Sequence, residues 1–336
     1  MTGRADIGEN ATADRIGPEV LEVDADAVVE QIVGDLKETV LKRLRKRGAV
    51  VALSGGIDSS VCAALAARAF APQRVLGIFM PEADSAGDTL DLSRLSADSV
   101  GIPTVLEDIT EILEATGCYR RRDEAFRQVL PEYGEGWKAK IVLPPLLGDD
   151  RFRLFSVVAE SPDGERHEAR LTSSAYREVV AATNFKQRTR KMLEYHHADR
   201  LDYAVVGTPN RLEYDQGFYV KNGDGAADVK PIAHLYKTQV YRLAEALGVP
   251  EEIRRRPPTT DTYALPQSQE EFYFSLPYDK MDLCLYARTN GYPPEAVADA
   301  VGLSPEDVER VYKDIEGKRR VTEYLSLPPV VFTPPS

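Results

Sequence analysis

The sequence predicts an α/β fold: a doubly wound parallel sheet with a hairpin insertion and C-terminal helices. Short apolar runs at 49–53 and 74–80 are each followed by a stretch whose apolar residues have helical spacing. Alternation of this kind is typical of a parallel sheet with helices on both faces. The chain has 336 residues, 43% of them hydrophobic and 29% charged, which is enough to bury the core that such a sheet requires.

The order of the predicted elements supports this class. Helical spacing over 20–47 precedes the first strand, and a second strand and helix cover 74–80 and 88–100. The further predicted elements are a strand at 104–109, a helix at 174–197, a strand at 203–207 and a helix at 236–247. A long loop over 208–233 precedes the last helix, and loops of more than about 15 residues inside compact domains are usually functional.

The chain divides into one central domain and two flanking segments. Residues 1–24 are predicted to form a flexible N-terminal arm, since the stretch up to about Pro18 has no periodicity. The domain is expected to span 25–320, with an insertion at about 120–172 that contains a hairpin turning at 161–165. Short helices with proline stops are predicted near the end, followed by a C-terminal tail over 321–336.

Composition excludes several classes of protein. The formal charge of −12 disfavours general binding to nucleic acid or to an anionic membrane. Cys62, Cys118 and Cys284 lie far apart in the chain, which argues against a zinc site or a disulfide framework and favours a reducing cytoplasm. No apolar stretch approaches the about 18 residues of a membrane span, and the polar N-terminus does not resemble a signal peptide. We therefore expect a cytoplasmic protein.

The most informative segment is the glycine loop between the first strand and the next helix, Ser54-Gly55-Gly56-Ile57-Asp58-Ser59-Ser60. Its glycines let the backbone turn sharply, and the first turn of the helix offers unpaired N–H groups to an anion. The serines add hydroxyl donors, and Asp58 adds a carboxylate for a cation. The loop lacks the Gly-Lys-Ser/Thr ending of kinase-type phosphate loops, so a kinase is disfavoured. The alternative interpretation is an ordinary glycine turn.

Further segments carry side chains suited to nucleotide chemistry. Asn184 and Arg188 share one face of a predicted helix, although a solvated face is the alternative. Thr208 and Glu213 follow the fourth strand, at the edge where open α/β sheets bind ligands. The other candidates are Lys221, Asp224 and Asp228 in the long loop, Lys237 at the start of the next helix, and Thr259 in the stretch 258–262. Asp224 lies between two glycines and could equally belong to a simple turn.

Together these segments resemble the ammonia-dependent NAD synthetases of the N-type ATP pyrophosphatase superfamily. The family's SGG-x-DS loop, N-x-x-x-R-x-R helix, G-T-x-x-x-x-E strand end and K-x-G-D-G-x-A-D loop occur in the same order at 54–59, 184–190, 207–213 and 221–228. Two further motifs complete the match: an L-x-K-x-Q helix start at 235–239, and a Pro-Thr stretch at 258–262 with Glu270 and Glu271 downstream. The resemblance implies an adenine nucleotide alpha hydrolase-like fold with a five-stranded sheet.

The resemblance also implies a reaction and its residues. ATP would adenylate the carboxylate of nicotinic acid adenine dinucleotide, and ammonia would then displace AMP to form NAD. Mg²⁺ is the expected cofactor, held by Asp58 and Glu213. Asp58, Lys221, Asp228 and Thr259 are the expected catalytic residues, and Asp228 is the candidate for holding the ammonium ion or accepting its proton. The ATP and pyrophosphate would be bound by Ser54, Gly55, Gly56, Asp58, Ser59, Ser60, Arg188, Thr208 and Lys237, and the dinucleotide by Lys221, Asp224 and Asp228. Lys186 is a further cation expected near the phosphates.

Some positions depart from the family pattern and leave the acceptor open. Arg256, Thr262 and Ser275 differ from the residues common in the family. The alternatives are a related adenylating ligase that acts on another carboxylate, by amidation or sulfur transfer, and a non-catalytic ATP-binding relative. Sulfur transfer is disfavoured because no cysteine lies in a reactive motif. A non-catalytic protein is disfavoured because binding alone does not need both metal carboxylates.

The nitrogen source and the assembly are also implied by the resemblance. The arm and helix before the first strand contain no residue set that could hydrolyse glutamine. We therefore expect free ammonia, or ammonia from a separate protein, as the donor. The family resemblance implies a homodimer.

Overall fold

The structure is a computed structural model that describes residues 15–144, 146–147, 154–259 and 262–332. Within these residues the central sheet has four parallel strands in the order β3-β2-β1-β7. Val50 of β1 pairs with Leu76 of β2 on one side and with Val205 of β7 on the other. The predicted α/β class with a parallel sheet is thus confirmed. The strands are β1 Ala49–Ala52, β2 Val75–Phe79, β3 Thr104–Leu106 and β7 Ala204–Val206.

The described sheet has four strands, whereas the resemblance implied five. Among the described residues beyond β7, a single parallel bridge joins the sheet edge, between Val206 and Val229, and the N–H of Gly207 donates to the carbonyl of Val229 at 2.8 Å. Pro231 follows two residues later and has no N–H to continue the ladder. The place of a fifth strand is therefore taken by one bridge.

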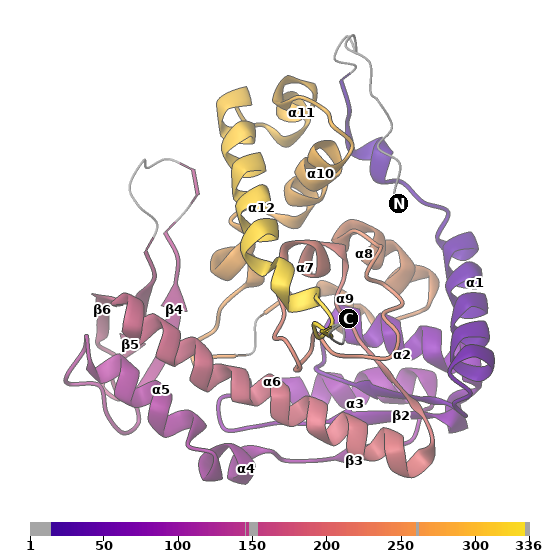
Figure 1. Ribbon diagram of the computed structural model, residues 1–336, viewed down its shortest axis with the longest axis horizontal. Helices are drawn as coiled ribbons and strands as arrows, with labels where there is room; N and C mark the ends of the chain where they lie inside the picture. The colour runs from indigo at the N-terminus through magenta and orange to yellow at the C-terminus, as the bar shows by residue number, and fades with distance from the viewer. Residues whose placement is uncertain (1–14, 145, 148–153, 260–261, 333–336) are drawn as a thin grey trace.

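Helices cover both faces of this sheet (Figure 1). Alternate residues of β1 point to opposite faces, so Val51 lies in one core cluster and Val50 in another. The Val51 face is covered by α1 Ala25–Leu36, α2 Ile57–Phe70, α3 Thr89–Val100, α8 Lys237–Ala246 and α9 Glu251–Arg255. The Val50 face is covered by α4 Thr110–Ala115, α5 Cys118–Arg127 and α6 Ser173–Leu201. The sheet is therefore doubly wound.

A second sheet, antiparallel, forms within the predicted insertion. The predicted hairpin is present as β5 Ser156–Glu160 and β6 Arg166–Arg170, closed by a bond of 2.9 Å from the N–H of Ser161 to the carbonyl of Glu165. Among the described residues a third strand, β4 Lys138–Val142, pairs with β5. The sequence did not predict β4, because its lysines gave the segment a polar pattern and no strand was expected there. The sheet packs on α5 and α6 beside one end of the central domain (Figure 1).

The C-terminal helices form a cluster with its own core. It consists of α10 Tyr278–Thr289, α11 Pro294–Val301 and the long α12 Pro305–Ser326, joined by the short α7 Arg211–Gln216 from the predicted long loop. Ile16 and Leu21, which lie in the predicted arm, pack into this core, and the N–H of Ile16 donates to the carbonyl of Ala296 at 3.0 Å. Part of the predicted tail continues α12 to Ser326.

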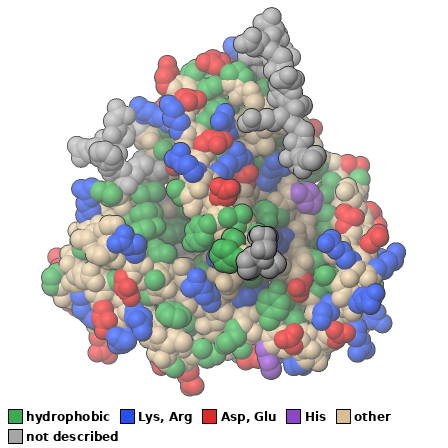
Figure 2. Space-filling model, in the orientation of Figure 1, with side chains coloured by type: hydrophobic (Ala, Val, Ile, Leu, Met, Phe, Trp, Pro, Cys, Tyr) green, Lys and Arg blue, Asp and Glu red, His purple; other side chains and the backbone are tan. Residues whose placement is uncertain are grey.

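Two surface properties complete the description. Hydrophobic side chains gather at the C-terminal end of α12 (Figure 2), where Val330, Val331 and Phe332 are exposed. Across the described ranges, none of the helices combines the length and apolar character that crossing a bilayer demands. Residues 1–14 of the predicted arm and 333–336 of the predicted tail lie outside the described residues.

Candidate active site

A cavity of about 420 Å³ opens at the carboxyl edge of the central sheet. Ser54 and Asp58 reach it from the end of β1, Met80 from the end of β2, and Thr208 from the end of β7. Helix α6 forms one wall, and the segments 217–220 and 256–259 form others. This is the edge at which open α/β sheets bind nucleotides.

The glycine loop is shaped to hold an anion at the floor of this cavity. Gly55 has φ +69°, and a Cβ there would lie 2.8 Å from Leu92 Cβ and 2.9 Å from the Thr89 carbonyl oxygen. Gly56 is the N-cap of α2 and makes no side-chain cap bond, so the first-turn N–H groups are left for a ligand. The hydroxyls of Ser59 and Ser60 each donate to the Gly56 carbonyl at 2.9 Å. Ser54, Gly56 and Ser59 therefore line the cavity, while Gly55 and Ser60 shape the loop behind it.

Asp58, Glu213 and Lys237 form a charged group beside this loop. Lys237 is fully buried and donates to the Asp58 carboxylate, which also accepts from Asn210 Nδ2 at 3.3 Å. Glu213 accepts from the Asn210 N–H and from Gln269 Nε2, both at 3.1 Å. Burial raises the pKa of Glu213 to about 8, and the charge of Asp58 adds to this. Burial acts to lower the pKa of Lys237, but Asp58 and Glu213 outweigh it and raise the value.

This group has the donor set that Mg²⁺ takes in nucleotide sites. Lys237 bonds to Asp58, and burial together with the charge of Asp58 makes a negative charge on Glu213 unfavourable without a further cation. Mg²⁺ is usually held by one or two carboxylates, with substrate phosphates and water completing the octahedron. Within the described ranges no three His, Cys, Asp or Glu residues cluster as a metal cage. Asp58 and Glu213 offer the two carboxylates that this kind of coordination uses.

Three more predicted residues reach the cavity. Thr208 follows β7, and Thr259, which also lines the cavity, bridges to Ser268. Asp224 accepts from the N–H of Val220 at 2.7 Å, and burial raises its pKa. Thr260, Asp261 and the side chains of Glu270 and Glu271 lie outside the described residues.

Three other predicted residues lie outside the described lining of the cavity. Lys221 donates to the carbonyls of Tyr324 and Leu327 at the end of α12, at 2.6 and 3.3 Å. Arg188 donates to the carbonyl of Lys221 at 3.3 Å. Asp228 is exposed and accepts from the N–H of Val205 at 2.7 Å, at the edge of the sheet. The roles expected for these three residues stay predictions.

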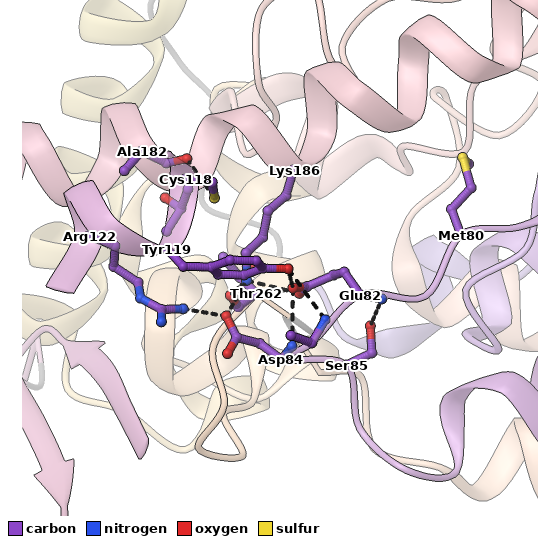
Figure 3. Close-up of polar contacts among 12 residues, drawn as sticks. Met80, Glu82, Asp84, Ser85, Cys118, Tyr119, Arg122, Ala182, Lys186 and Thr262 are labelled. Carbon is purple, nitrogen blue, oxygen red and sulfur yellow. Dashed lines mark hydrogen bonds and ion pairs between the residues drawn. The ribbon is translucent and has the colours of Figure 1, made fainter. Parts of the chain in front are cut away.

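Lys186 was expected near the phosphates, but the structure places it in a buried ion-pair network (Figure 3). Its Nζ donates to Glu82 at 2.9 Å, to Asp84 at 2.6 Å and to the carbonyl of Thr262 at 2.7 Å. Arg122 also pairs with Asp84, and the Tyr119 hydroxyl donates to Glu82 at 2.7 Å. This network fixes the loop after β2 to α5 and α6, so Lys186 is a structural cation with no free donor for ATP.

Comparison with known proteins identifies the family. The profile of the family described as NAD synthase matches residues 28–129 and 163–322. The chain belongs to the NAD synthase family. It is 57% identical to the NH(3)-dependent NAD(+) synthetase of Mesorhizobium japonicum, over 93% of this chain and 98% of that protein. It is 56% identical to the protein of the same description from Rhizobium meliloti, over 94% of each chain.

Solved structures of other proteins share the fold. The NMN synthetase of Francisella tularensis aligns with a TM-score of 0.64 at 20% identity, over 93% of this chain and 99% of that one. The NH3-dependent NAD synthetase of Campylobacter jejuni aligns with a TM-score of 0.61 at 20% identity, over 93% and 100% of the two chains. At such identities the likeness supports the fold alone.

Several residues of this family site were not singled out from the sequence. Asn210 forms a capping box with Glu213 and contacts Asp58, and it lies inside the G-T-x-x-x-x-E segment, where that signal could have been used. Gln269, which donates to Glu213, has no local signal because it comes from a different segment. Arg256, noted only as a departure from the family, lines the cavity and donates to Asp88 at 2.9 Å.

Proposed function

We propose that this chain catalyses ammonia-dependent NAD⁺ formation from nicotinic acid adenine dinucleotide and ATP, releasing AMP and pyrophosphate. The observation that carries the proposal is that the glycine loop, Asp58, Glu213 and Lys237 face one cavity at the edge of the sheet. The names of the relatives above 50% identity agree with it.

The first step activates the carboxylate, which is a poor electrophile. One carboxylate oxygen attacks the α-phosphorus of ATP, the bond between that phosphorus and the bridging oxygen breaks, and pyrophosphate leaves. Negative charge builds on the pyrophosphate, and we expect the loop N–H groups and the hydroxyl of Ser54, which lines the cavity, to donate hydrogen bonds to it. Lys237 adds positive charge, and Asp58 with Glu213 would hold the Mg²⁺ that neutralises the phosphates when bound.

The second step forms the amide. Ammonia attacks the carbonyl carbon, the bond to AMP breaks, and the nitrogen loses a proton. Asp228 is the predicted residue for the ammonium ion, and Asp224 is predicted to orient the dinucleotide. Asp224 lines the cavity and has a pKa raised by burial, which supports its role near the acceptor. Thr208 and Thr259 both line the cavity and are candidate phosphate ligands.

Amidation is favoured over sulfur transfer by the state of the cysteines. Burial raises the pKa of Cys118 to about 11 and that of Cys284 to about 12, and it raises the pKa of Cys62 well above its ordinary value. The nucleophilic form of cysteine is the thiolate, so none of the three is suited to carry sulfur. We further propose a homodimer in the cytoplasm that takes free ammonia or ammonia delivered by a separate protein, as the family motifs imply.

The direct test is an assay of the reaction products. Purified protein is incubated with ATP, Mg²⁺, ammonium chloride and nicotinic acid adenine dinucleotide, and NAD⁺, AMP and pyrophosphate are quantified by chromatography. Equal amounts of NAD⁺ and AMP are expected, and no NAD⁺ is expected when ATP or ammonium is omitted. Pyrophosphate release only with a different carboxylic acid would keep the ATP chemistry and overturn the proposed acceptor.

A further inference from the structure

One residue of the cavity lining comes from a segment that the family profile does not match. The profile leaves 130–162 unmatched, and this interval contains β4 and β5. Phe155, immediately before β5, lines the same cavity as the glycine loop. We infer that Phe155 is a specificity-determining residue, which stacks with a heteroaromatic ring of the carboxylate-bearing substrate. The inference rests on the proposed function.

Phe155 belongs to a continuous aromatic wall. Its ring stacks on Tyr176 of α6 with centroids 4.3 Å apart and an interplanar angle of 14°, and it lies 6.4 Å from the ring of Phe272. Phe272 in turn lies 5.9 Å from Phe218 and 6.2 Å from Tyr263. All five rings line the cavity, and four of them are only partly buried. A wall of partly exposed rings offers flat apolar surface to a ligand.

The insertion is bonded to another segment that lines the cavity. Lys140 of β4 donates to the carbonyl of Pro266 at 3.0 Å, and Gln267 donates to the carbonyl of Ile141 at 2.6 Å. Pro266 and Gln267 belong to the same stretch of chain that supplies Thr259 and Phe272 to the cavity. Phe155 is therefore attached to a fixed strand pair, which is the condition for a stacking residue to select its ligand.

The position of the wall along α6 assigns it to the second substrate. The C-terminal half of α6 packs on the central sheet through Ala198, whereas its N-terminal half packs on the antiparallel sheet through Ala175. Tyr176 and Glu194 both line the cavity, and at 1.5 Å per residue they lie about 27 Å apart along the helix axis. ATP occupies the sheet end, where the glycine loop holds its phosphates. The aromatic end is left for a ring of the carboxylic substrate.

The chemistry of that substrate suits such a wall. Nicotinic acid adenine dinucleotide carries two flat rings, a positively charged N-ribosylated pyridine and an adenine. Aromatic faces attract a flat ring by stacking and a cationic ring by its charge as well. Stacking of this kind tolerates small shifts of the ligand ring. One residue of the insertion can therefore change the affinity for the dinucleotide without changing the chemistry at the glycine loop.

The test separates binding of the two substrates. Initial rates are measured for wild type, Phe155→Leu, Phe155→Tyr and the neighbouring control Leu154→Ala, varying the dinucleotide at saturating ATP and then ATP at saturating dinucleotide. Leu154 is 43% exposed and does not line the described cavity. We expect Phe155→Leu to raise the KM for the dinucleotide about 3- to 10-fold, with kcat and the KM for ATP changed less than about twofold. Phe155→Tyr and Leu154→Ala should resemble wild type.

A second arm identifies the ring. Nicotinic acid mononucleotide has the pyridine but no adenine. An equal rise in KM for mononucleotide and dinucleotide in Phe155→Leu assigns the wall to the pyridine. A rise in KM for the dinucleotide alone assigns it to the adenine. An unchanged KM in Phe155→Leu, or a rise confined to ATP, would overturn the inference. Tyr176→Leu tests the same wall from α6 if Phe155→Leu does not fold. Failure of wild type to form NAD⁺ is a different result, because it refutes the proposed function itself.

Discussion

The buried Nζ of Lys237 donates to the carboxylate of Asp58, a residue 179 positions earlier in the chain. The bond joins the first turn of α8 to the first turn of α2, so the N-terminal ends of two helices meet at one point of the sheet edge. Two positive helix ends and a lysine converge there, with the carboxylates of Asp58 and Glu213 as counter-charges. The site is therefore arranged for polyphosphate with a divalent cation.

Replacing Lys237 removes the only side-chain cation that contacts Asp58 within the described residues. For Lys237→Met we expect kcat to fall about 10²- to 10³-fold, the range for losing one charge-stabilising donor. Steady-state assays at saturating ATP measure it. Lys230→Met is the matched control, because Lys230 lies over the Tyr214 ring at 4.6 Å and not on the cavity lining. Equal losses in both variants would show a general effect of charge.

Gly55 and Gly101 provide a matched pair for testing the glycine loop. Their φ angles are +69° and +67°, so alanine costs each a similar backbone strain, about 1–2 kcal/mol. A Cβ at Gly55 also meets Thr89 and Leu92 within 3 Å, whereas one at Gly101 meets nothing within 4 Å. We expect Gly55→Ala to lower kcat/KM for ATP more than tenfold and Gly101→Ala to lose stability only. Urea unfolding and ATP kinetics on both variants check this, and full activity in Gly55→Ala would contradict the loop geometry.

The elements of the fold that have a local sequence pattern could be predicted from the sequence. The parallel strands, their helices and the hairpin could be predicted because each has its own periodicity or turn. The count of five strands came from the family resemblance, and Pro231 explains why the described chain forms only a bridge there. The strand β4 and the packing of Ile16 in the C-terminal core depend on partners distant in sequence, which no local pattern records.

The site was predictable to the extent that its residues follow strand ends. Thr208 follows β7, and Asp58 and Glu213 lie in the first turns of the helices after β1 and β7. They line one cavity because parallel strands end at one edge. Lys186 shows the limit of this reasoning. A lysine on a helix face near the site looks identical in sequence whether it points to ATP or to Glu82 and Asp84, and only the fold decides.

The buried network around Lys186 predicts a large loss of stability on breaking it. Lys186→Met leaves Glu82 and Asp84 buried with one cation fewer, and breaking a buried ion pair typically costs about 3–5 kcal/mol. Urea unfolding followed by circular dichroism measures the change. Lys46→Met is the control, since its pair with Asp202 is exposed and is worth at most about 1 kcal/mol. A change below 1 kcal/mol in Lys186→Met would mean that the network is open to water.

Asp282 predicts a specific pH dependence of stability. It is buried on α10 and accepts from the N–H groups of Lys237 and Thr238 at 3.2 and 2.7 Å, and burial raises its pKa from 3.8 to about 6. Between these values the folded state holds a proton that the unfolded state has lost. The contribution of Asp282 to stability is therefore present below about pH 4 and is lost as pH rises through about 6.

The variant Asp282→Asn removes this titration while keeping one acceptor for the start of α8. We expect the melting temperature of wild type, relative to the variant, to fall as pH rises from 4 to 6 and to stay constant above that range. Differential scanning calorimetry at several pH values measures the difference curve. A difference that does not vary with pH would show that Asp282 is ionised throughout, held by the helix N-terminus and Lys237.

The last prediction compares the two aspartates of the K-x-G-D-G-x-A-D loop. Asp224 lines the cavity, whereas Asp228 faces the sheet edge and accepts from Val205. If the family role of Asp228 holds here, Asp228→Asn will raise the KM for ammonium and lower the amidation rate, while AMP transfer measured by pyrophosphate exchange stays normal. If Asp228 only anchors the bridge beside β7, Asp228→Asn will lower the melting temperature and leave ammonium kinetics unchanged. Asp224→Asn is the companion variant and should raise the KM for the dinucleotide in either case, because its carboxylate orders the loop at the cavity through Val220.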